Sequence, residues 1–312
     1  MPGKYRLFAG TAHPALAAAV AAELGVPLGP ARVDRFPDGE LWLELETSVR
    51  ARSVYLIQPT GPPVDEHLVE LLAWLDALRR AGAGPVTVVA PYFGYARQDR
   101  RTARGPIVAR LAASLIERAG AAALMAVDLH TPQVEGFFDL PVEALTARGV
   151  LLAALRPRLA PDVVVVSPDA GFVRSAAHFA AALAAPLAVI HKARTGPRAT
   201  EVIGLAGEVR GRSALVVDDM IATGSTLRRA VEVLVAAGVR PEVTVAATHG
   251  VFAPGAEREL THPAIRAVLV TDSLPPPARP IPHLERVPLA GLLAEAIRRH
   301  ARGASLRDLA AR

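Results

Sequence analysis

The two halves of this 312-residue chain repeat one pattern at an offset of 160 residues. Residues 49–53 (VRARS) lead into the apolar run 54–57, and residues 209–213 (VRGRS) lead into the apolar run 214–217. In each half a turn, a helix-like stretch, an Ala-Gly pair and a second apolar run follow in the same order. A similarity at fixed spacing indicates an internal repeat. We therefore expect a duplication of one α/β unit.

Short apolar runs alternate with helical patterns along the whole chain, which is typical of parallel sheets covered by helices. The predicted strands cover residues 6–9, 54–57, 86–90, 124–127, 163–166, 187–190, 215–217, 243–247 and 267–270. A boundary between the units is expected within residues 145–160. The proline-rich stretch 275–282 is expected to be extended, and residues 289–299 are expected to form a closing helix.

Residues 214–227, which read ALVVDDMIATGSTL, indicate a ligand site more strongly than any other segment. A buried strand ends in Asp218 and Asp219, and a turn of small residues (Thr223 to Thr226) then leads into a helix. The glycine lets the backbone approach a ligand, and the free amides of the first helical turn suit a phosphate. The two carboxylates can accept hydrogen bonds from sugar hydroxyls. The segment therefore predicts a phosphorylated sugar as ligand, and the alternative is an ordinary solvated turn.

Polar residues also follow three other predicted strands, where ligands of open parallel sheets collect. They are His130, Asp169, and the pair Lys192 and Arg194. The chain has two lysines and 33 arginines, so its composition is strongly biased toward arginine. Lys192 is a lysine in spite of that bias. A compact ammonium suits a phosphoryl group in transfer in a way that a planar guanidinium does not. The alternative is that Lys192 survived by chance.

His130 and Asp169 could together hold Mg²⁺, which takes few protein ligands besides substrate oxygens. The alternatives are a histidine with ordinary partners at a strand end and an aspartate that caps a helix beginning near Gly171. In the first half, residues 35–40 (RFPDGE) predict a tight turn whose Phe36 could stack on a base. Residues 91–100 (PYFGYARQDR) bring Arg97 within reach of a polyphosphate, or are turn residues with core aromatics.

Composition excludes several classes of protein. The chain has no cysteine, so disulfides, thiolate zinc sites and cysteine nucleophiles are excluded. No apolar run approaches the roughly 18 residues of a membrane span, and the N-terminal residues predict an amphipathic helix rather than a signal peptide. The net charge of +5 comes from scattered arginines, which suits small anions rather than nucleic acid. We expect a soluble cytoplasmic protein that binds neither nucleic acid nor membranes.

The motifs FPDGE, PYFGYARQDR, VDLH, GFFDLPV, SPD and VVDDMIATGST occur in the order and near the spacing of one family. Over about residues 7–299, the chain closely resembles the ribose-phosphate diphosphokinases, or phosphoribosyl pyrophosphate (PRPP) synthetases. The resemblance implies transfer of the diphosphoryl group of Mg-ATP to the C1 hydroxyl of ribose 5-phosphate, giving PRPP and AMP. A non-catalytic regulatory relative is the alternative. A nucleobase phosphoribosyltransferase would share only the last motif and would be one unit.

The resemblance also implies a role for each matching residue. Lys192 and Arg194 would stabilise the transferred group, His130 and Asp169 would hold Mg²⁺, and Asp218 and Asp219 would meet the ribose hydroxyls. The 5-phosphate would be bound by Ala222, Thr223, Gly224, Ser225 and Thr226. ATP would be bound by Phe36, Asp38, Gly39, Glu40, Arg97 and Gln98, with the hairpin residues supplied by a neighbouring subunit.

The implied fold is two duplicated domains like the type I phosphoribosyltransferases, each a mostly parallel sheet flanked by helices. The first domain covers residues 1–145, completed by a C-terminal helix in 289–312, and the second covers residues 146–288. The implied assembly is a homo-oligomer of dimers, up to a hexamer. Three departures from the family pattern stand out. Ala222 replaces an aspartate, Gly171-Phe172 replaces Gly-Gly, and residues 101–106 are about two residues short in a segment that helps form an allosteric ADP site.

Overall fold

The computed structural model describes residues 5–194 and 200–310, and the side chains of residues 192–203 stand outside that description. The chain divides into two compact units. The first comprises Met1–Thr146, Ser273–Pro275 and Leu289–Arg312, and the second comprises Ala147–Asp272 and Pro276–Pro288. Each unit has its own sheet and its own hydrophobic core.

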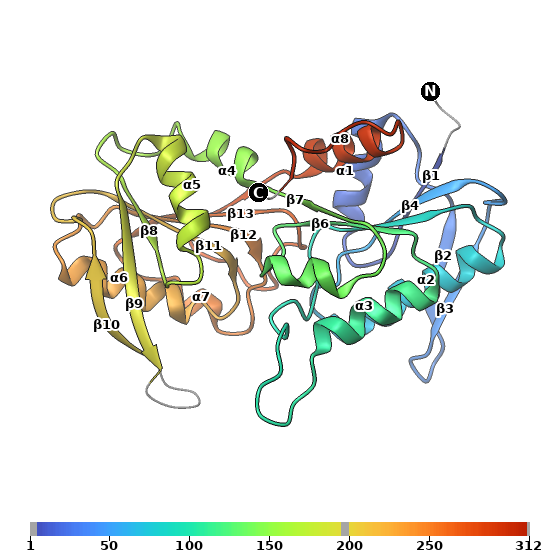
Figure 1. The fold of residues 1–312 in the computed structure, drawn as a ribbon, viewed down its shortest axis with the longest axis horizontal. Helices are drawn as coiled ribbons and strands as arrows, with labels where there is room; N and C mark the ends of the chain where they lie inside the picture. The colour runs from blue at the N-terminus through green and yellow to red at the C-terminus, as the bar shows by residue number, and fades with distance from the viewer. Residues whose placement is uncertain (1–4, 195–199, 311–312) are drawn as a thin grey trace. The chain divides into compact units, whose positions relative to one another are not determined.

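The first unit contains a five-stranded parallel sheet in the order β1-β4-β5-β6-β7 (Figure 1). Its strands are β1 (Tyr5–Ala9), β4 (Ser53–Ile57), β5 (Val86–Ala90), β6 (Ala123–Val127) and β7 (Val142–Leu145). Its helices are α1 (Pro14–Leu24), α2 (Val64–Arg80), α3 (Val108–Ala119), the 3₁₀ helix η1 (Pro132–Phe137) and α8 (Ala290–His300). A separate antiparallel hairpin joins β2 (Ala31–Arg35) to β3 (Leu41–Leu45).

The central strands of this unit are almost entirely apolar because helices cover both faces of a parallel sheet, and Thr87 is the polar exception in β5. Every residue of β5 and β6 is buried. Trp74 of α2 packs on Phe8 of β1, with ring centroids 5.7 Å apart. The C-terminal helix α8 lies beside α1 (Figure 1), and the Tyr55 hydroxyl lies 2.7 Å from His300 Nδ1. Helix α8 therefore packs against the N-terminal helix α1 within the first unit.

The second unit contains a seven-stranded sheet in the order β10-β9-β8-β11-β12-β13-β14. Its strands are β8 (Val164–Ser167), β9 (Leu187–Arg194), β10 (Thr200–Ala206), β11 (Ala214–Ile221), β12 (Val243–Gly250), β13 (Ile265–Thr271) and β14 (Leu284–Val287). Only β10 runs antiparallel to its neighbour. Its helices are α4 (Arg148–Leu155), α5 (Val173–Leu183), α6 (Ser225–Ala236) and the short α7 (Ala256–Glu259).

The two units share one topology. The parallel run β1-β4-β5-β6-β7 of the first corresponds to β8-β11-β12-β13-β14 of the second. In each unit the first strand is followed by a helix (α1 or α5), then an antiparallel hairpin (β2–β3 or β9–β10), then the second strand of the run. This repetition confirms the predicted α/β class and the predicted duplication.

Several strand predictions were incomplete or too short. The sequence pattern did not predict β7, β10 or β14, which lie at sheet edges and are partly exposed where the structure describes their side chains. Such strands lack the continuous apolar run that marks a buried strand. The tight turn expected at residues 35–40 does lie between two strands, β2 and β3, whose bounds were not predicted. The strand β11 was predicted to end at Val217 but continues to Ile221. Among the described residues, no helix has both the length and the apolarity needed to cross a membrane.

Candidate active site

The predicted ligand residues of the second unit come from three adjacent strands. Because β9, β8 and β11 are neighbours and parallel, their carboxyl ends lie at the same edge of the sheet. The loop after β8 carries Asp169, the end of β11 carries Asp218 and Asp219, and the end of β9 carries Lys192. The fold thus brings these four backbone positions to one edge.

The acidic pair lies within β11 rather than beyond its end. Asp218 is half-buried and Asp219 is 9% exposed. Asp218 Oδ1 accepts a hydrogen bond from the Asp219 amide at 2.9 Å. Burial raises the pKa of the Asp218 carboxyl well above its usual value, and the charges of Asp219 and Asp169 raise it further. The fold therefore holds three carboxylates within electrostatic reach of one another, an arrangement that hydroxyl donors or a cation would relieve.

Asp169 stabilises its own loop. Its Oδ1 accepts hydrogen bonds from the amides of Gly171 (2.9 Å) and Phe172 (3.2 Å), just before α5 begins. The Ser167 hydroxyl donates to the Asp169 carbonyl at 2.7 Å. These bonds close the loop before α5 and do not cap the helix, whose N-cap is Phe172 with no side-chain cap hydrogen bond, so the predicted capping alternative is wrong. Ser167 was not predicted as a site residue, although its place in the SPD motif is the signal that could have identified it.

The turn of small residues connects β11 to α6 as predicted. Gly224 has φ +81°, a left-handed conformation that favours glycine, and it carries no side chain that could cap α6. Thr223 Oγ1 lies 2.9 Å from Ser225 Oγ and 3.4 Å from the Ser225 amide. Two hydroxyls therefore lie at the first turn of α6, and together with the free amides of a helix N-terminus they suit an anion.

The two remaining predicted residues of this edge are only partly described. Lys192 and Arg194 belong to β9, where Lys192 is paired with Val202 and Arg194 with Thr200 of β10. These two strands form a long hairpin (Figure 1). The side chains of Lys192 and Arg194 lie outside the described residues, so their predicted roles stay predictions.

The predicted ATP residues of the first unit occupy a hairpin turn and a loop. The turn between β2 and β3 is closed by hydrogen bonds from the Phe36 amide to the Glu40 carbonyl (2.9 Å) and from the Gly39 amide to the Phe36 carbonyl (2.8 Å). Asp38 Oδ1 accepts from the Glu40 amide at 3.1 Å, and Gly39 has φ +94°. The tight turn is thus confirmed. Phe36 is 50% exposed at its tip, so its ring is free of the core.

The loop after β5 separates core aromatics from exposed polar groups. Tyr92 and Phe93 are buried, which matches the alternative of core aromatics, whereas Arg97 and Gln98 are exposed. Asp99 Oδ2 accepts a hydrogen bond from the Thr131 hydroxyl at 2.8 Å. This bond ties the loop that carries Arg97 to the segment that follows His130. It was not predicted, because nothing in the sequence indicates that residues 32 positions apart are in contact.

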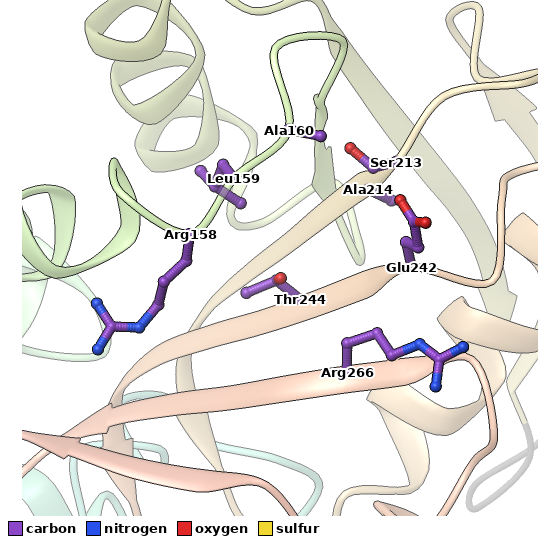
Figure 2. Close-up of a pocket in the computed structure, with 8 residues that line it drawn as sticks. All are labelled: Arg158, Leu159, Ala160, Ser213, Ala214, Glu242, Thr244 and Arg266. Carbon is purple, nitrogen blue, oxygen red and sulfur yellow. The ribbon is translucent and has the colours of Figure 1, made fainter.

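His130 is exposed and belongs to the first unit, whereas Asp169 belongs to the second. Each is described in its own unit, so the predicted metal pair stays a prediction. The second unit also has a pocket of about 230 Å³, whose lining residues are drawn in Figure 2. It lies at the amino ends of β11 and β12 and is lined by Arg158, Leu159, Ala160, Ser213, Ala214, Glu242, Thr244 and Arg266.

Comparison with known proteins identifies the family. Residues 5–120 match the model of the N-terminal domain of ribose phosphate pyrophosphokinase, and residues 193–310 match the phosphoribosyl synthetase-associated domain. A ribose-phosphate pyrophosphokinase of Burkholderia pseudomallei is 43% identical over 307 residues, which is 97% of this chain and 96% of that protein. One from a Nostoc species is 45% identical over 297 residues, which is 94% of this chain and 90% of that protein.

A solved structure agrees with the sequence comparison. The crystal structure of phosphoribosylpyrophosphate synthetase from Mycobacterium smegmatis superposes with a TM-score of 0.90 at 39% identity, covering 97% of this chain and all of that one. The extent of the match, over both units, agrees with the order of motifs from FPDGE to VVDDMIATGST. The chain belongs to the ribose-phosphate pyrophosphokinase family.

Proposed function

We propose that this chain transfers the diphosphoryl group of ATP to the C1 hydroxyl of ribose 5-phosphate, giving PRPP and AMP. The observation that carries the proposal is the carboxyl edge of the second sheet. There a turn of small residues at the start of α6, an acidic pair and the Lys192 position come together in a member of the ribose-phosphate pyrophosphokinase family.

Ribose 5-phosphate would bind along β11 and the turn that follows it. The amides and hydroxyls of residues 222–226 would hold the 5-phosphate, and Asp218 and Asp219 would accept hydrogen bonds from the ribose hydroxyls. Ala222 offers no side-chain oxygen, so hydroxyl recognition would depend on the acidic pair. The half-buried position of Asp218 favours this role, because a buried carboxylate gains more from a donated hydrogen bond than an exposed one.

ATP would be bound by residues of the first unit. Arg97 and Gln98 are exposed on the loop after β5, where a guanidinium can contact phosphate oxygens. Phe36, Asp38, Gly39 and Glu40 form the tip of the β2–β3 hairpin, and the exposed Phe36 ring could stack on adenine. We assign ATP binding to residues 1–145 with the C-terminal helix in 289–312, and ribose phosphate binding to residues 146–288.

Mg²⁺ would be held by His130 and Asp169 together with substrate oxygens. Asp169 Oδ1 is engaged by two amides, whereas its Oδ2 accepts no hydrogen bond from the described residues, so one carboxylate oxygen remains for a cation. Within the described part of the chain, no three His, Asp or Glu side chains form a complete metal site. Magnesium often completes its coordination with phosphate oxygens and water, so the donor set fits. When bound, the ion would neutralise charge on the phosphates.

In the transfer itself, the C1 oxygen would form a bond to the β-phosphorus of ATP. The bond from that phosphorus to the oxygen that bridges it to the α-phosphorus would break, and AMP would leave with the electron pair. The C1 hydroxyl proton would be released to solvent. Lys192 and Arg194 would stabilise the negative charge on the transferred group. Phosphoryl transfer depends mainly on positioning and on such charge stabilisation, so no covalent enzyme intermediate is needed.

A direct assay tests the proposal. The protein is mixed with ATP, MgCl₂ and ribose 5-phosphate, and AMP and PRPP are quantified by chromatography. Equal amounts of the two products support the reaction, and addition of EDTA should abolish it if Mg²⁺ is required. If neither product forms with any ratio of substrates and magnesium, the chain is a non-catalytic regulatory relative. We also assign the protein to the cytoplasm, where ATP and sugar phosphates are available.

We expect the chain to form a homo-oligomer built from dimers. Phe36 is half-exposed at the hairpin tip, and Val69, Leu111 and Leu115 are exposed apolar residues on α2 and α3 of the first unit. Large apolar side chains on a surface favour contact with a partner. Light scattering at micromolar concentration should give a mass that is an even multiple of 32.7 kDa. A 32.7 kDa species that retains full activity would contradict the donation of Phe36 by a neighbouring subunit.

ADP is expected to inhibit this protein weakly, or only in competition with ATP. Residues 101–106 form a short exposed turn, closed by a hydrogen bond from the Gly105 amide to the Thr102 carbonyl (2.9 Å). That turn replaces a longer segment which the family resemblance associates with the allosteric site. Initial rates at several ADP concentrations should therefore return to the uninhibited value as ATP is raised. Cooperative inhibition that persists at saturating ATP would show that the allosteric site is intact.

A further inference from the structure

In the first unit a carboxylate is buried at the carboxyl edge of the parallel sheet. The second unit carries its predicted ligand residues at the equivalent edge of its own sheet. Glu70 of α2 is 2% exposed. Its Oε1 accepts hydrogen bonds from the Thr11 amide (2.7 Å) and from the Trp74 indole nitrogen (3.2 Å), and its Oε2 accepts one from the Thr11 hydroxyl (2.5 Å). Three donors from two elements therefore converge on one carboxylate, as they would on a bound oxyanion.

Gln58 completes this arrangement. It is fully buried at the end of β4, and its side-chain oxygen accepts a hydrogen bond from the Ala12 amide at 3.2 Å. The loop after β1 thus turns two successive amides, those of Thr11 and Ala12, toward side-chain oxygens from neighbouring elements. Backbone amides that converge in this way form an anion-binding nest.

The repeat relates these residues to the site of the second unit. Since β1 corresponds to β8 and β4 to β11, the loop that holds Thr11 corresponds to the loop that holds Asp169. At the offset of 160 residues, Gln58 corresponds to Asp218. The helices that follow align at an offset of 156, because the buried residues of α2 and α6 and the Ala-Gly pairs after them match at that spacing, so Glu70 corresponds to Thr226. Thr226 lies in the first turn of α6 and carries a hydroxyl where Glu70 carries a carboxylate. The second unit therefore has no counterpart of the carboxylate that fills this position in the first.

The packing around Gly10 shows that the space is full. A Cβ atom on Gly10 would lie 2.2 Å from Gln58 Oε1 and 2.8 Å from Glu70 Oε1. Real Cβ atoms do not approach other atoms so closely, so even a methyl group has no room there. A sugar phosphate or nucleotide phosphate has still less.

We infer that Glu70 is an internal ligand that occupies an oxyanion-binding nest in the first unit. The duplicated edge of the first sheet keeps donors suited to an anion, and the α2 carboxylate satisfies them permanently. Removal of that carboxylate uncovers a site for a small oxyanion, of which formate is the closest mimic of the missing group. This inference is independent of the reaction proposed for the second unit.

Thermal unfolding of Glu70→Ala in sodium formate and in sodium chloride of equal ionic strength tests the inference. The substitution leaves the buried Trp74 indole and the two donors of the exposed Thr11 without an acceptor, so Tm should fall by about 2–12 °C in chloride. Formate should then raise Tm with saturation, recovering a large part of the loss, because a ligand that binds only the folded state stabilises it by mass action. The wild type and Asp76→Ala, which removes an exposed carboxylate from the same helix, should respond equally to both salts.

Glu70→Gln separates an anion site from a simple cavity. The amide preserves the volume, so this variant should lose stability but gain nothing from formate. It should also speed hydrogen exchange at the Thr11 amide and at the Trp74 indole, since one acceptor oxygen now serves three donors. If Glu70→Ala folds and formate acts on it no more than chloride, the inference is wrong. If that variant does not fold, unchanged exchange at Thr11 and Trp74 in Glu70→Gln contradicts the inference equally.

Discussion

Replacement of Lys192 by alanine should lower kcat by about 10³–10⁵-fold, the range found when a cation that stabilises a transferring phosphoryl group is removed. The expectation depends on two observations. Lys192 is one of two lysines among 35 basic residues, and its backbone lies on β9, the neighbour of the strand that leads to Asp169. Tm should change little, because β9 is held by its pairing with β8 and β10 through backbone hydrogen bonds. Single-turnover rates of PRPP formation with saturating substrates provide the measurement.

Two further variants give this prediction its controls. Lys192→Arg keeps the charge but replaces a compact ammonium with a planar, more weakly hydrated group, so it should recover only a small part of the rate. Lys4→Ala removes the other lysine of the chain and should leave kcat unchanged. A Lys192→Ala variant that turns over at a near-normal rate would remove this residue from the mechanism, whatever the result for arginine.

The sequence predicted the local structure of the second unit's candidate site because the relevant residues are close together along the chain. The run from Ala214 to Thr226 contains its own strand, acidic pair and turn, and the structure changes only the point where the strand ends. Strand β11 continues to Ile221 because β12 pairs with it as far as Gly250, although β8 pairs with it only as far as Val216. A propensity pattern does not contain that information, since the extra pairing comes from a separate strand beyond the next helix.

The arrangement of the first unit was harder to predict. The contact between Thr131 and Asp99, and the network of Glu70 with Thr11, join segments 32 and 59 residues apart. Neither segment carries a local signal of its partner. In the sequence, Glu70 has the pattern of an ordinary polar residue on an amphipathic helix. Its burial depends on how α2 packs on the sheet, which the sequence pattern does not predict. The duplication could be predicted, and so could the loss of the acidic pair from the first unit, where Gln58 and Pro59 stand in its place. The carboxylate that α2 supplies at that edge could not.

Asp218→Asn should have opposite effects on stability and on activity. Burial, together with the charges of Asp219 and Asp169, raises the pKa of Asp218 above its ordinary value of 3.8. The folded state therefore binds this proton more tightly than the unfolded state does. It follows that the contribution of Asp218 to stability is lost as pH rises from about 3.8 through the raised pKa, and that at neutral pH the ionised group destabilises the free protein. An uncharged amide removes this cost, so the Tm of the variant should exceed that of the wild type at neutral pH.

The same substitution should lower kcat/KM for ribose 5-phosphate. An amide accepts hydrogen bonds less strongly than a carboxylate, and loss of a charged hydrogen bond corresponds to about a 10–100-fold decrease in kcat/KM for the sugar. Asp76→Asn is the matched control, because the pKa of exposed Asp76 is lowered by hydrogen bonds to Arg80 and Arg79, the reverse of the Asp218 case. It should not raise Tm and should leave kcat/KM unchanged. If Asp218→Asn lowers Tm at neutral pH, the carboxylate stabilises the free fold, and the argument that its ligand relieves a buried charge fails.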